Sequence, residues 1–539
     1  MGREHESRAP SLAHGAALIT LATAASRVTG FVRVVVVAGA MGTTFLANTY
    51  QTANTAPNLM FELLAAGVLT SIFVPTFIEY LVKDEREEGW HAANVLTTVA
   101  LVGLTILAIV LASVAPLIMR LLTIGVDRLD VRAREIALGT DFLRLFAPQV
   151  VFYGAGMIMT AALHAHRRFA MAAIAPIFNN VVVIGIYIAY ALMRGDKPPT
   201  IARISTPEMW VLGAGTTLGV VVMTGCLIPQ LRRLGWRYRW RFDRSHPAVR
   251  KAMRLGVWAL GYAGGYQAGL IVVLILANRV EGGVAAYQWA FTFFYVPHAL
   301  FAAPIFHVLF PVMTEHATKG EKPEFKTRLK DGLDMLTFVL LPVAALMVIV
   351  AVPLAKVSLE FGVMSGTGAA LIGRVIAAFA VGLPLYSAFL VLTRAYYAYS
   401  DTKTPTIVNA ATVAASSAVG AILFFLLSAD WSVAGLAFGH SFGFLLGTGV
   451  LAFLLARRLD EGMSMWWSPA LSRALLFGSV AAGMMWLVGS LVPDDSKGQA
   501  LGNFLTVSLV GMVVYGGLML WAKSPELLKV ATVVRRRRS

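Results

Sequence analysis

The chain has little charge and almost no cysteine. Only 14% of its 539 residues are Asp, Glu, Lys or Arg, whereas a soluble chain carries about 25%. The single cysteine, Cys226, excludes an internal disulfide, and its position in an apolar run argues against a cysteine-based metal site. The residues present instead are apolar, because 58% of the chain is hydrophobic and its mean hydropathy is +0.71. These values predict a membrane protein.

Sequence motifs of soluble enzymes are also missing. The chain has no P-loop, which argues against a self-contained ATP drive, and it has no Gly-x-Ser-x-Gly or His-Glu-x-x-His pattern. No segment outside the apolar stretches is long enough for a separate domain. His298, His307 and His440 are isolated and lack the spacing of metal ligands. We therefore expect no enzymatic activity, no cofactor and no metal site.

Fourteen long apolar stretches fill almost the whole chain. A helix that crosses a membrane needs about 20 mostly apolar residues, and each stretch meets that length. The sequence therefore predicts an all-α polytopic protein with fourteen spans. They lie near residues 12–40, 46–80, 92–121, 136–164, 170–193, 208–231, 252–278, 284–314, 333–356, 367–399, 405–428, 433–456, 468–492 and 499–522.

The basic residues predict the orientation of these spans. The net charge is +16, and Lys and Arg gather in alternate loops, with nine in residues 232–254 and four more in the run 535–538. The positive-inside rule then places both termini in the cytoplasm. This topology accounts for the charge without nucleic-acid binding. Apolar character continues past residues 15–26, so we expect an uncleaved first helix rather than a signal peptide.

The two halves of the chain share proline positions, which indicates an internal repeat. Phe73-Val74-Pro75 with Glu79 matches Leu309-Phe310-Pro311 with Glu315, and Pro148 matches Pro384, both at an offset of 236. We predict an N-terminal lobe of six spans over 1–245, a pseudo-symmetric C-terminal lobe of six over 246–460, and two further spans with a basic tail over 461–539. Parallel repeats of this kind hold their substrate between the halves.

Two arginines lie inside the first predicted span, in Ser26-Arg27-Val28-Thr29-Gly30-Phe31-Val32-Arg33. A cation in hydrocarbon costs about 2.5–3.5 kcal/mol, so it usually faces a wet cavity or an anion. Arg27 and Arg33 are about 240° apart around a helix, and they share one face only if Gly30 acts as a hinge. Both are candidates to bind an anionic headgroup; snorkelling or pairing with a structural carboxylate is the alternative.

The second predicted span carries a stripe of polar residues along one helix face. The spacings within the stripe are 3, 4, 3 and 4, and Pro57, a second candidate hinge, interrupts it. The stripe either lines a cavity or forms interhelical hydrogen bonds. Its members are Asn48, Gln51, Thr55, Asn58 and Glu62. Glu62 is the only carboxylate that we expect deep in a span, and it is the natural partner for one of the two arginines.

Several ordered motifs resemble those of the MurJ (MviN) lipid II flippases, within the multidrug/oligosaccharidyl-lipid/polysaccharide exporter superfamily. The matching motifs run from Ser26-Arg27-Val28-x-Gly30-Phe31-x-Arg33 and Pro57-Asn58-Leu59 through Arg168-Phe169 to Tyr397-Ala398-x-x-Asp401-Thr402-Lys403-Thr404-Pro405. The run from Ala53 to Ser71 is most similar to actinobacterial members.

The resemblance implies fourteen helices, arranged as two lobes and a final pair that forms a lipid groove. It implies that the protein flips undecaprenyl-diphosphate-linked peptidoglycan precursor from the inner to the outer leaflet, with Arg27 and Arg33 lining the cavity. The chain also departs from the family pattern. A cavity arginine of helix two falls at Phe61, one of helix eight falls at Thr292, and spans 7, 11 and 12 lack the carboxylates of a sodium site.

We therefore expect an alternating-access flippase that contacts the lipid-linked precursor and membrane lipids, with cell-wall synthesis or division proteins as further partners. Three alternatives stay open from the residues. They are a flippase for another polyprenyl-linked glycan, an antiporter similar to the multidrug and toxin extrusion (MATE) proteins, and a transport-inactive scaffold for cell-wall synthesis.

Overall fold

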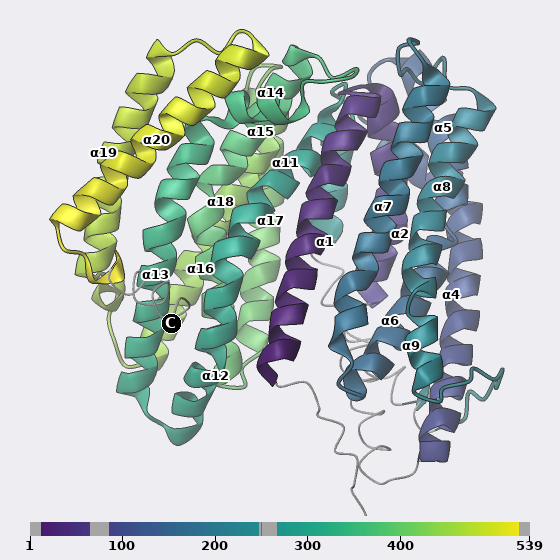
Figure 1. Cartoon of the computed structure of the whole chain (residues 1–539), viewed down its shortest axis with the longest axis horizontal. Coiled ribbons are helices and arrows are strands. Elements are labelled where there is room, and N and C mark those ends of the chain that lie inside the picture. The colour runs from purple at the N-terminus through teal and green to yellow at the C-terminus, as the bar shows by residue number, and fades with distance from the viewer. Residues whose placement is uncertain (1–11, 65–85, 247–248, 251–266, 528–539) are drawn as a thin grey trace, which may run out of the picture. The chain divides into compact units, whose positions relative to one another are not determined.

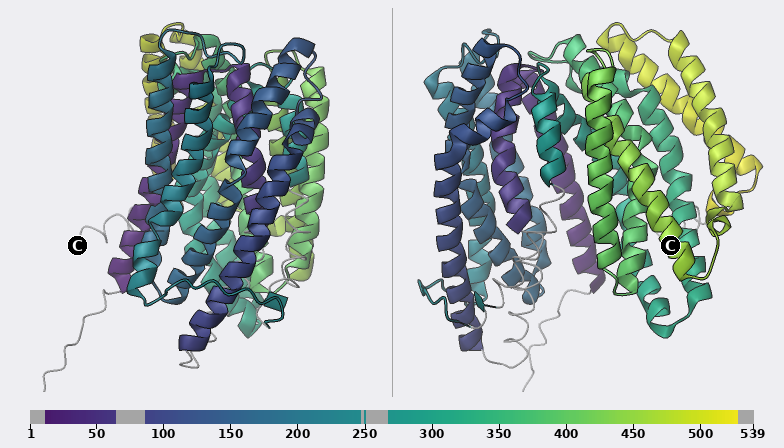
Figure 2. Two further views of the ribbon diagram at one scale, coloured as in Figure 1. Left: turned by 90° about the vertical axis from the view of Figure 1, so that its right-hand side faces the viewer. Right: turned by 180° about the vertical axis from the view of Figure 1, so that it is seen from behind.

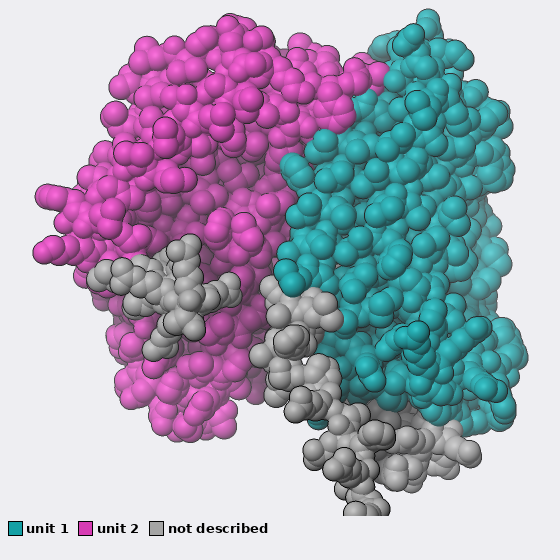
Figure 3. Space-filling view, in the orientation of Figure 1, with its two compact units in different colours: residues 1–267 teal, residues 268–539 magenta. Residues whose placement is uncertain are grey.

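A computed structural model of the chain describes residues 12–64, 86–246, 249–250 and 267–527. The described residues form helices joined by short connections and divide into two compact units, residues 1–267 and 268–539 (Figure 3). The predicted lobe boundary near residue 245 and the separation of the last two spans stay predictions.

Unit 1 contains eight described helices (Figure 1). They are α1 (Leu12–Met41), α2 (Phe45–Leu64), α4 (Arg86–Leu122), α5 (Leu129–Phe146), α6 (Gln149–Ala165), α7 (Phe169–Arg194), α8 (Thr206–Gly225) and the short α9 (Ile228–Arg233). Within this unit α1 packs on α7, α7 on α8, and α2 on α5.

Unit 2 is also built of helices. A short apolar helix covers Gln267–Ala277. It is followed by α11 (Gly283–Pro297), the π-helix η2 (His298–Ala302), α12 (Ala303–Lys319), α13 (Lys322–Ile349), α14 (Ala351–Leu359), α15 (Gly366–Val381), α16 (Leu383–Ala398), α17 (Lys403–Leu426), α18 (Ser432–Arg458), the 3₁₀ helix η3 (Met463–Trp466), α19 (Pro469–Leu491) and α20 (Lys497–Trp521).

Eleven helical segments of the described residues are long and apolar enough to cross a membrane, and the pair α15–α16, bent by 45°, makes a twelfth. The class of multi-pass membrane protein is thereby confirmed. The second and seventh predicted spans run into residues 65–85 and 251–266, which lie outside the described residues, as do Phe73-Val74-Pro75 and Glu79 of the proposed repeat. The count of fourteen spans stays a prediction.

The chain turns in the same way at matching places in the two units. After α6 and after α16 a non-glycine residue adopts left-handed backbone, and the next N–H bonds back to a helix carbonyl five residues earlier. The two closures are Arg167 (φ 55°) with Arg168 N–H to Leu163 O at 2.8 Å, and Ser400 (φ 59°) with Asp401 N–H to Tyr396 O at 3.0 Å. The same closure also follows α18 at Asp460 and α20 at Lys523, so it is a common helix ending among the described residues and does not by itself indicate a repeat.

Hydroxyl groups bridge the helix breaks that proline creates in each unit. Pro148 separates α5 from α6, and Pro384 lies beside the bend between α15 and α16. In each unit, two hydroxyls seven residues apart on one helix donate to carbonyls seven residues apart around the break. The bonds are Thr217 to Leu145 O (2.7 Å) and Thr224 to Phe152 O (2.9 Å), and Ser441 to Ala378 O (2.8 Å) and Thr448 to Leu385 O (2.9 Å). Neighbouring helices thus satisfy carbonyls near each break.

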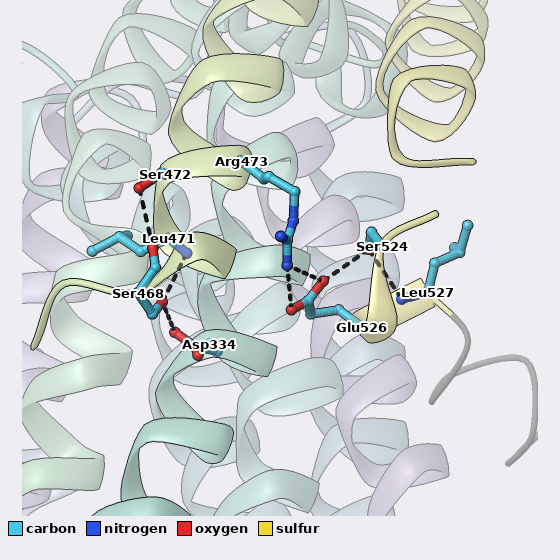
Figure 4. Close-up of polar contacts among 8 residues, drawn as sticks. All are labelled: Asp334, Ser468, Leu471, Ser472, Arg473, Ser524, Glu526 and Leu527. Carbon is cyan, nitrogen blue, oxygen red and sulfur yellow. Dashed lines mark hydrogen bonds and ion pairs between the residues drawn. The ribbon is translucent and has the colours of Figure 1, made fainter. Parts of the chain in front are cut away.

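The last two helices, α19 and α20, lie side by side and pack against α13 and α14 of the same unit (Figures 1 and 2). Figure 4 shows polar contacts that fasten one end of the pair. Arg473 donates to both carboxylate oxygens of Glu526 at 3.1 and 3.3 Å, and Ser468 donates to Asp334 at 2.6 Å. Away from these contacts the pair exposes large apolar side chains such as Trp486 and Met512, as expected of a surface in contact with lipid.

Asp401, in the connection between α16 and α17, joins three parts of unit 2. It accepts hydrogen bonds from the N–H and hydroxyl of Thr404 at 3.0 and 2.9 Å, and it pairs with Arg458 of α18 at 2.9 Å. Burial raises the pKa of Asp401, but the bonds from Thr404 and Arg458 together lower it below its ordinary value. The motif from Asp401 to Pro405 therefore has a structural role.

The lowered pKa of Asp401 predicts how acid weakens this connection. A carboxylate whose pKa is lower in the folded protein stabilises the fold above its unfolded pKa, about 3.9 for Asp, and this contribution is lost as the pH falls through the folded value. We expect Asp401→Asn to be less stable than the unmutated chain at pH 6, with the difference shrinking below about pH 4. Thermal unfolding in detergent across this range measures it; a difference that grew on acidification would contradict the assignment.

Candidate functional site

The Ser26–Arg33 motif is held against α7 by one amide. Asn180 of α7 donates to the carbonyl oxygen of Ser26 at 3.2 Å and to the hydroxyl oxygen of Thr29 at 3.0 Å. Thr29 in turn donates to the Ser26 carbonyl at 3.1 Å. These contacts fix the rotation of α1 about its own axis, and they decide which of its side chains enter unit 1.

The two arginines of α1 lie on different faces of that helix. Arg33 follows Ser26 and Thr29 at helical spacing, so it shares the face that packs on α7, and it is half-buried. Arg27 is exposed, as is its neighbour Val28. The predicted separation of the arginines around the helix is therefore retained, since α1 continues through Gly30 as one helix.

The guanidinium of Arg33 lies within electrostatic range of three tyrosines from three helices. They are Tyr50 of α2, Tyr153 of α6 and Tyr187 of α7. Tyr50 is fully buried, and its hydroxyl lies 3.1 Å from that of Tyr187 and 2.6 Å from that of Thr216 on α8. Arg33 therefore stands at the edge of a polar cluster inside unit 1.

Aromatic rings hold this cluster in place. Tyr50 packs edge-on against Phe142 and Phe146 of α5, each with ring centroids 5.5 Å away, and against Tyr187 at 6.0 Å. Such edge-to-face pairs add about 0.5–1.5 kcal/mol beyond their buried area. The hydroxyl of Tyr50 is thus fixed by packing as well as by hydrogen bonds. Sequence reasoning missed these tyrosines; a signal was available in the position of Tyr50, directly before Gln51 of the polar stripe.

The polar stripe of α2 runs from buried to exposed positions. Asn48, Gln51 and Thr55 are buried, Asn58 is half-buried and Glu62 is exposed. The hydroxyl of Thr55 donates to the backbone carbonyl of Gln51 at 2.7 Å. The helix continues across Pro57. The buried part of the stripe is suited to interhelical packing, whereas Asn58 and Glu62 at its other end are less buried.

The partner of Glu62 and the burial of a second carboxylate, Glu135, differ from what the sequence predicted. Glu62 accepts a hydrogen bond from the Gln267 amide at 2.8 Å, so its described partner is an amide rather than an arginine. The expectation that Glu62 is the only deep carboxylate was wrong, because Glu135 of α5 is fully buried and accepts from the Thr49 hydroxyl at 3.2 Å. Glu135 lies one residue before the start predicted for that span, and the hydropathy pattern therefore hid it.

Two histidines of unit 2, His298 and His440, belong to an aromatic cluster and both contact Tyr386. His298 lies 2.9 Å from the Ser387 hydroxyl through Nδ1. His440 is surrounded by phenylalanine and tyrosine rings, among them Phe379 at 5.2 Å and Phe444 at 4.7 Å between centroids. Among the described residues, no group of three or more His, Cys, Asp or Glu is placed to hold a metal ion.

Gly30 offers a test of the predicted hinge. A Cβ at this position would lie 3.6 Å from the nearest neighbouring atom, the Asn180 Nδ2, which is an ordinary van der Waals distance. Glycine inside a helix costs about 0.5–1 kcal/mol relative to alanine, so Gly30→Ala should raise the thermal unfolding midpoint in detergent. If Gly30 is a hinge, the stabilised variant should nevertheless transport more slowly; full transport activity would contradict the hinge.

Comparisons with known proteins identify the family of the chain. The family model described as "Lipid II flippase MurJ" matches residues 37–501. A curated relative, "Probable lipid II flippase MurJ" of Rhizobium tropici, is 27% identical over 505 residues, covering 92% of this chain and 91% of the relative.

Two solved structures share the fold. A lipid II flippase MurJ in an inward closed conformation superposes with a TM-score of 0.74 at 20% identity, over 94% of this chain and 99% of that one. An inward-facing multidrug resistance MATE transporter of the MOP superfamily gives 0.58 at 14% identity, over 82% and 94%. The family match spans most of the chain and includes α2, α6, α7 and α8, which carry Tyr50, Tyr153, Tyr187 and Thr216, whereas Arg27 and Arg33 precede it. The chain therefore belongs to the lipid II flippase MurJ family.

Proposed function

We propose that this protein moves lipid II, the undecaprenyl-diphosphate-linked peptidoglycan precursor, from the inner to the outer leaflet of the bacterial inner membrane. The observation that carries the proposal is the family match over residues 37–501, supported by the shared fold of a solved lipid II flippase. The multi-pass helical architecture agrees with a carrier, and no covalent chemistry is needed. The rest of the cycle follows from this chain's own residues.

Arg33 would hold the diphosphate of the substrate, and Arg27, which lies on another face of α1, would join it when α1 bends at Gly30. Charge-assisted hydrogen bonds from guanidinium to phosphate are shorter and stronger than neutral ones, and a low dielectric around them strengthens the attraction further. Arg33 is half-buried and within electrostatic range of the Tyr50 and Tyr187 hydroxyls, a polar setting that suits a bound anion. Because Phe61 and Thr292 stand where the family pattern has further arginines, these two cations carry more of the binding here.

The polar residues of the α2 stripe would contact or border the part of the substrate next to the diphosphate. We propose that Asn58 and Glu62, at the accessible end of the α2 stripe, contact the sugar-peptide head, while Asn48, Gln51 and Thr55 shape the wall behind them. The polyprenyl tail would stay in lipid along the apolar face of α19 and α20. We also propose that fourteen spans cross the membrane. The distribution of Lys and Arg then predicts that both termini lie in the cytoplasm.

Membrane potential is a candidate drive for resetting the empty carrier. Moving one elementary charge through the membrane potential changes the free energy by about 2.3 kcal/mol per 100 mV, and the proposed site is cationic when empty. Flipping in proteoliposomes with a potassium diffusion potential tests this coupling. Rates that stay the same at all imposed potentials would rule it out.

The experiment that tests the function is rescue of a bacterial strain depleted of its own lipid II flippase. The unmutated chain should restore growth, and labelled lipid II should become accessible on the outer leaflet. Rescue without lipid II movement would favour a scaffold for cell-wall synthesis and division proteins. Lack of both, with the protein present in the membrane, would contradict the proposal.

A cation-coupled antiporter is the second candidate, and Glu135 is the observation that favours it. Its buried carboxylate in unit 1 is the kind of group that a coupling ion needs in a membrane carrier. Glu135→Gln keeps the shape of the side chain and removes its charge. Loss of proton- or sodium-driven drug efflux in this variant, together with efflux by the unmutated chain, would support the antiporter instead.

A further inference from the structure

The segment that follows α9 alternates arginines with aromatic residues. Arg237, Arg239 and Arg241 interleave with aromatic side chains, and residues 236–243 have no helical structure. The first aromatic residue, Trp236, is buried, but the next three expose about half of their surface or more. Their exposed fractions are 44% for Tyr238, 66% for Trp240 and 47% for Phe242. Large exposed aromatic side chains beside cations call for a partner with both apolar and anionic parts.

Two side chains of α4 hold this segment against unit 1. Asn94 Oδ1 accepts from the indole N–H of Trp236 at 3.0 Å and from the backbone N–H of Arg239 at 3.3 Å. The Thr98 hydroxyl lies 3.0 Å from that of Tyr238 and accepts from the backbone N–H of Arg241 at 3.2 Å.

The docking therefore uses backbone groups and two aromatic side chains. The guanidinium groups of Arg237, Arg239 and Arg241 take part in none of these hydrogen bonds, and all three side chains are exposed. Stacking adds to the docking, since Trp90 lies between His166 at 5.3 Å and Trp236 at 6.2 Å, measured between ring centroids. The segment thus has a fixed position and presents its cations outward.

Its position along α4 places the segment at a membrane surface. The candidate span Trp90–Leu122 has 33 residues, a length of about 50 Å, whereas the hydrocarbon core is about 30 Å thick. About 10 Å at each end therefore extends into the headgroup region. Asn94 lies four residues from Trp90 and Thr98 eight, about 6 and 12 Å along the helix. The segment that they hold therefore lies between the headgroup region and its boundary with the hydrocarbon core.

We propose that residues 237–242 form a binding surface for the headgroups of anionic phospholipids. Arg237, Arg239 and Arg241 would contact the phosphates, and Trp240 with its aromatic neighbours would lie among the headgroups, where Trp and Tyr are enriched in membrane proteins. Anionic lipids attract basic residues beside membrane spans. This surface lies on α4 and the α9 connection, and it is independent of the α1 arginines proposed to bind the transported diphosphate.

Lipid binding to the purified full-length chain tests the proposal. The probes are phosphatidylglycerol and phosphatidylcholine, titrated in a neutral detergent and followed by native mass spectrometry. We expect the unmutated chain to prefer phosphatidylglycerol. The triple variant Arg237→Gln, Arg239→Gln, Arg241→Gln should weaken that binding by at least about tenfold and leave phosphatidylcholine binding and the lipid-free unfolding midpoint unchanged, because the docking hydrogen bonds remain.

The matched control removes the same charge from the tail by Arg535→Gln, Arg536→Gln, Arg537→Gln. This control should change phosphatidylglycerol affinity by less than about twofold if the segment 237–242 is the site. An equal loss of phosphatidylglycerol affinity in both triple variants would show that binding depends on net charge alone, and would overturn the proposal. Absence of any preference for phosphatidylglycerol in the unmutated chain would overturn it as well.

Two single substitutions separate docking from headgroup contact. Asn94→Ala keeps every arginine but removes the acceptor for Trp236 and Arg239, so it should weaken phosphatidylglycerol binding as a positioning residue does. Trp240→Ala should weaken binding. Trp210→Ala removes an exposed indole near the N-terminal end of α8, outside the segment 237–242, and should leave binding unchanged. Unchanged affinity in both Asn94→Ala and Trp240→Ala would contradict the proposed surface.

Discussion

Arg33→Ala should reduce lipid II flipping by tenfold or more in proteoliposomes and should fail to rescue a flippase-depleted strain. A hydrogen bond to a charged group contributes about 1.5–3 kcal/mol, which corresponds to roughly a tenfold to hundredfold change in binding. Two further arginines of the family pattern are absent here, so fewer cations remain to compensate. Arg33→Lys should keep part of the activity, since it retains the charge but not the paired donors of guanidinium.

The control for this experiment is Arg144→Ala. Arg144 is exposed on α5 and lies 3.8 Å from Asp141, a surface pair that contributes little to stability. Its removal should leave flipping near the unmutated rate. If Arg33→Ala flips lipid II as fast as Arg144→Ala, the diphosphate is not held by Arg33. An unchanged unfolding midpoint in Arg33→Ala would confirm that a loss of flipping is a loss of binding.

Gly439→Ala should destabilise unit 2 more than any other alanine substitution discussed here. A Cβ at Gly439 of α18 would lie 2.4 Å from both Cα and N of Gly420 on α17, and 2.5 Å from the Ser416 carbonyl oxygen. These are backbone atoms, which cannot rotate away, so α17 and α18 must separate. Overpacking of this kind costs about 1–3 kcal/mol, and the unfolding midpoint in detergent should fall accordingly.

The same helix provides the matched control, Gly449→Ala. A Cβ at Gly449 would meet no atom within 4 Å, so this variant should be neutral or slightly more stable through its helix propensity. Gly439 belongs to a four-residue repeat of glycines along α18, with Gly435, Gly443 and Gly447, and such small residues let membrane helices approach closely. Equal midpoints for the two variants would show that α17 and α18 separate without cost.

Hydropathy was sufficient to predict the membrane class and most helix positions. An apolar run of about 20 residues must be helical in a bilayer, because each backbone polar group needs a partner within its own segment. The helix breaks at Pro148 and beside Pro384 have a local cause as well, because proline lacks the N–H that a continuing helix needs. The hydroxyl partners on α8 and α18 that bridge those breaks could not be predicted, since their pairing depends on which helices become neighbours.

The candidate site could be predicted only in part. The presence of Arg27, Arg33 and the α2 stripe is a property of the sequence, because polar groups in an apolar run are visible without any structure. Their surroundings are not. Burial of Glu135, the amide partner of Glu62 and the tyrosines around Arg33 all arise from contacts between residues far apart in the chain.

By itself, the sequence determined that this is a helical multi-pass membrane protein with cations inside its first span. Hydropathy and charge are local properties of a segment, and they decide whether that segment is apolar and long enough to cross a bilayer. Only the tertiary structure decided which arginine faces the polar cluster and which faces outward. That choice follows from Asn180, which binds Ser26 and Thr29 and thereby fixes the rotation of α1. The tertiary structure also shows that the arginine-rich connection after α9 is docked against unit 1, since it is hydrogen-bonded to Asn94 and Thr98 of α4.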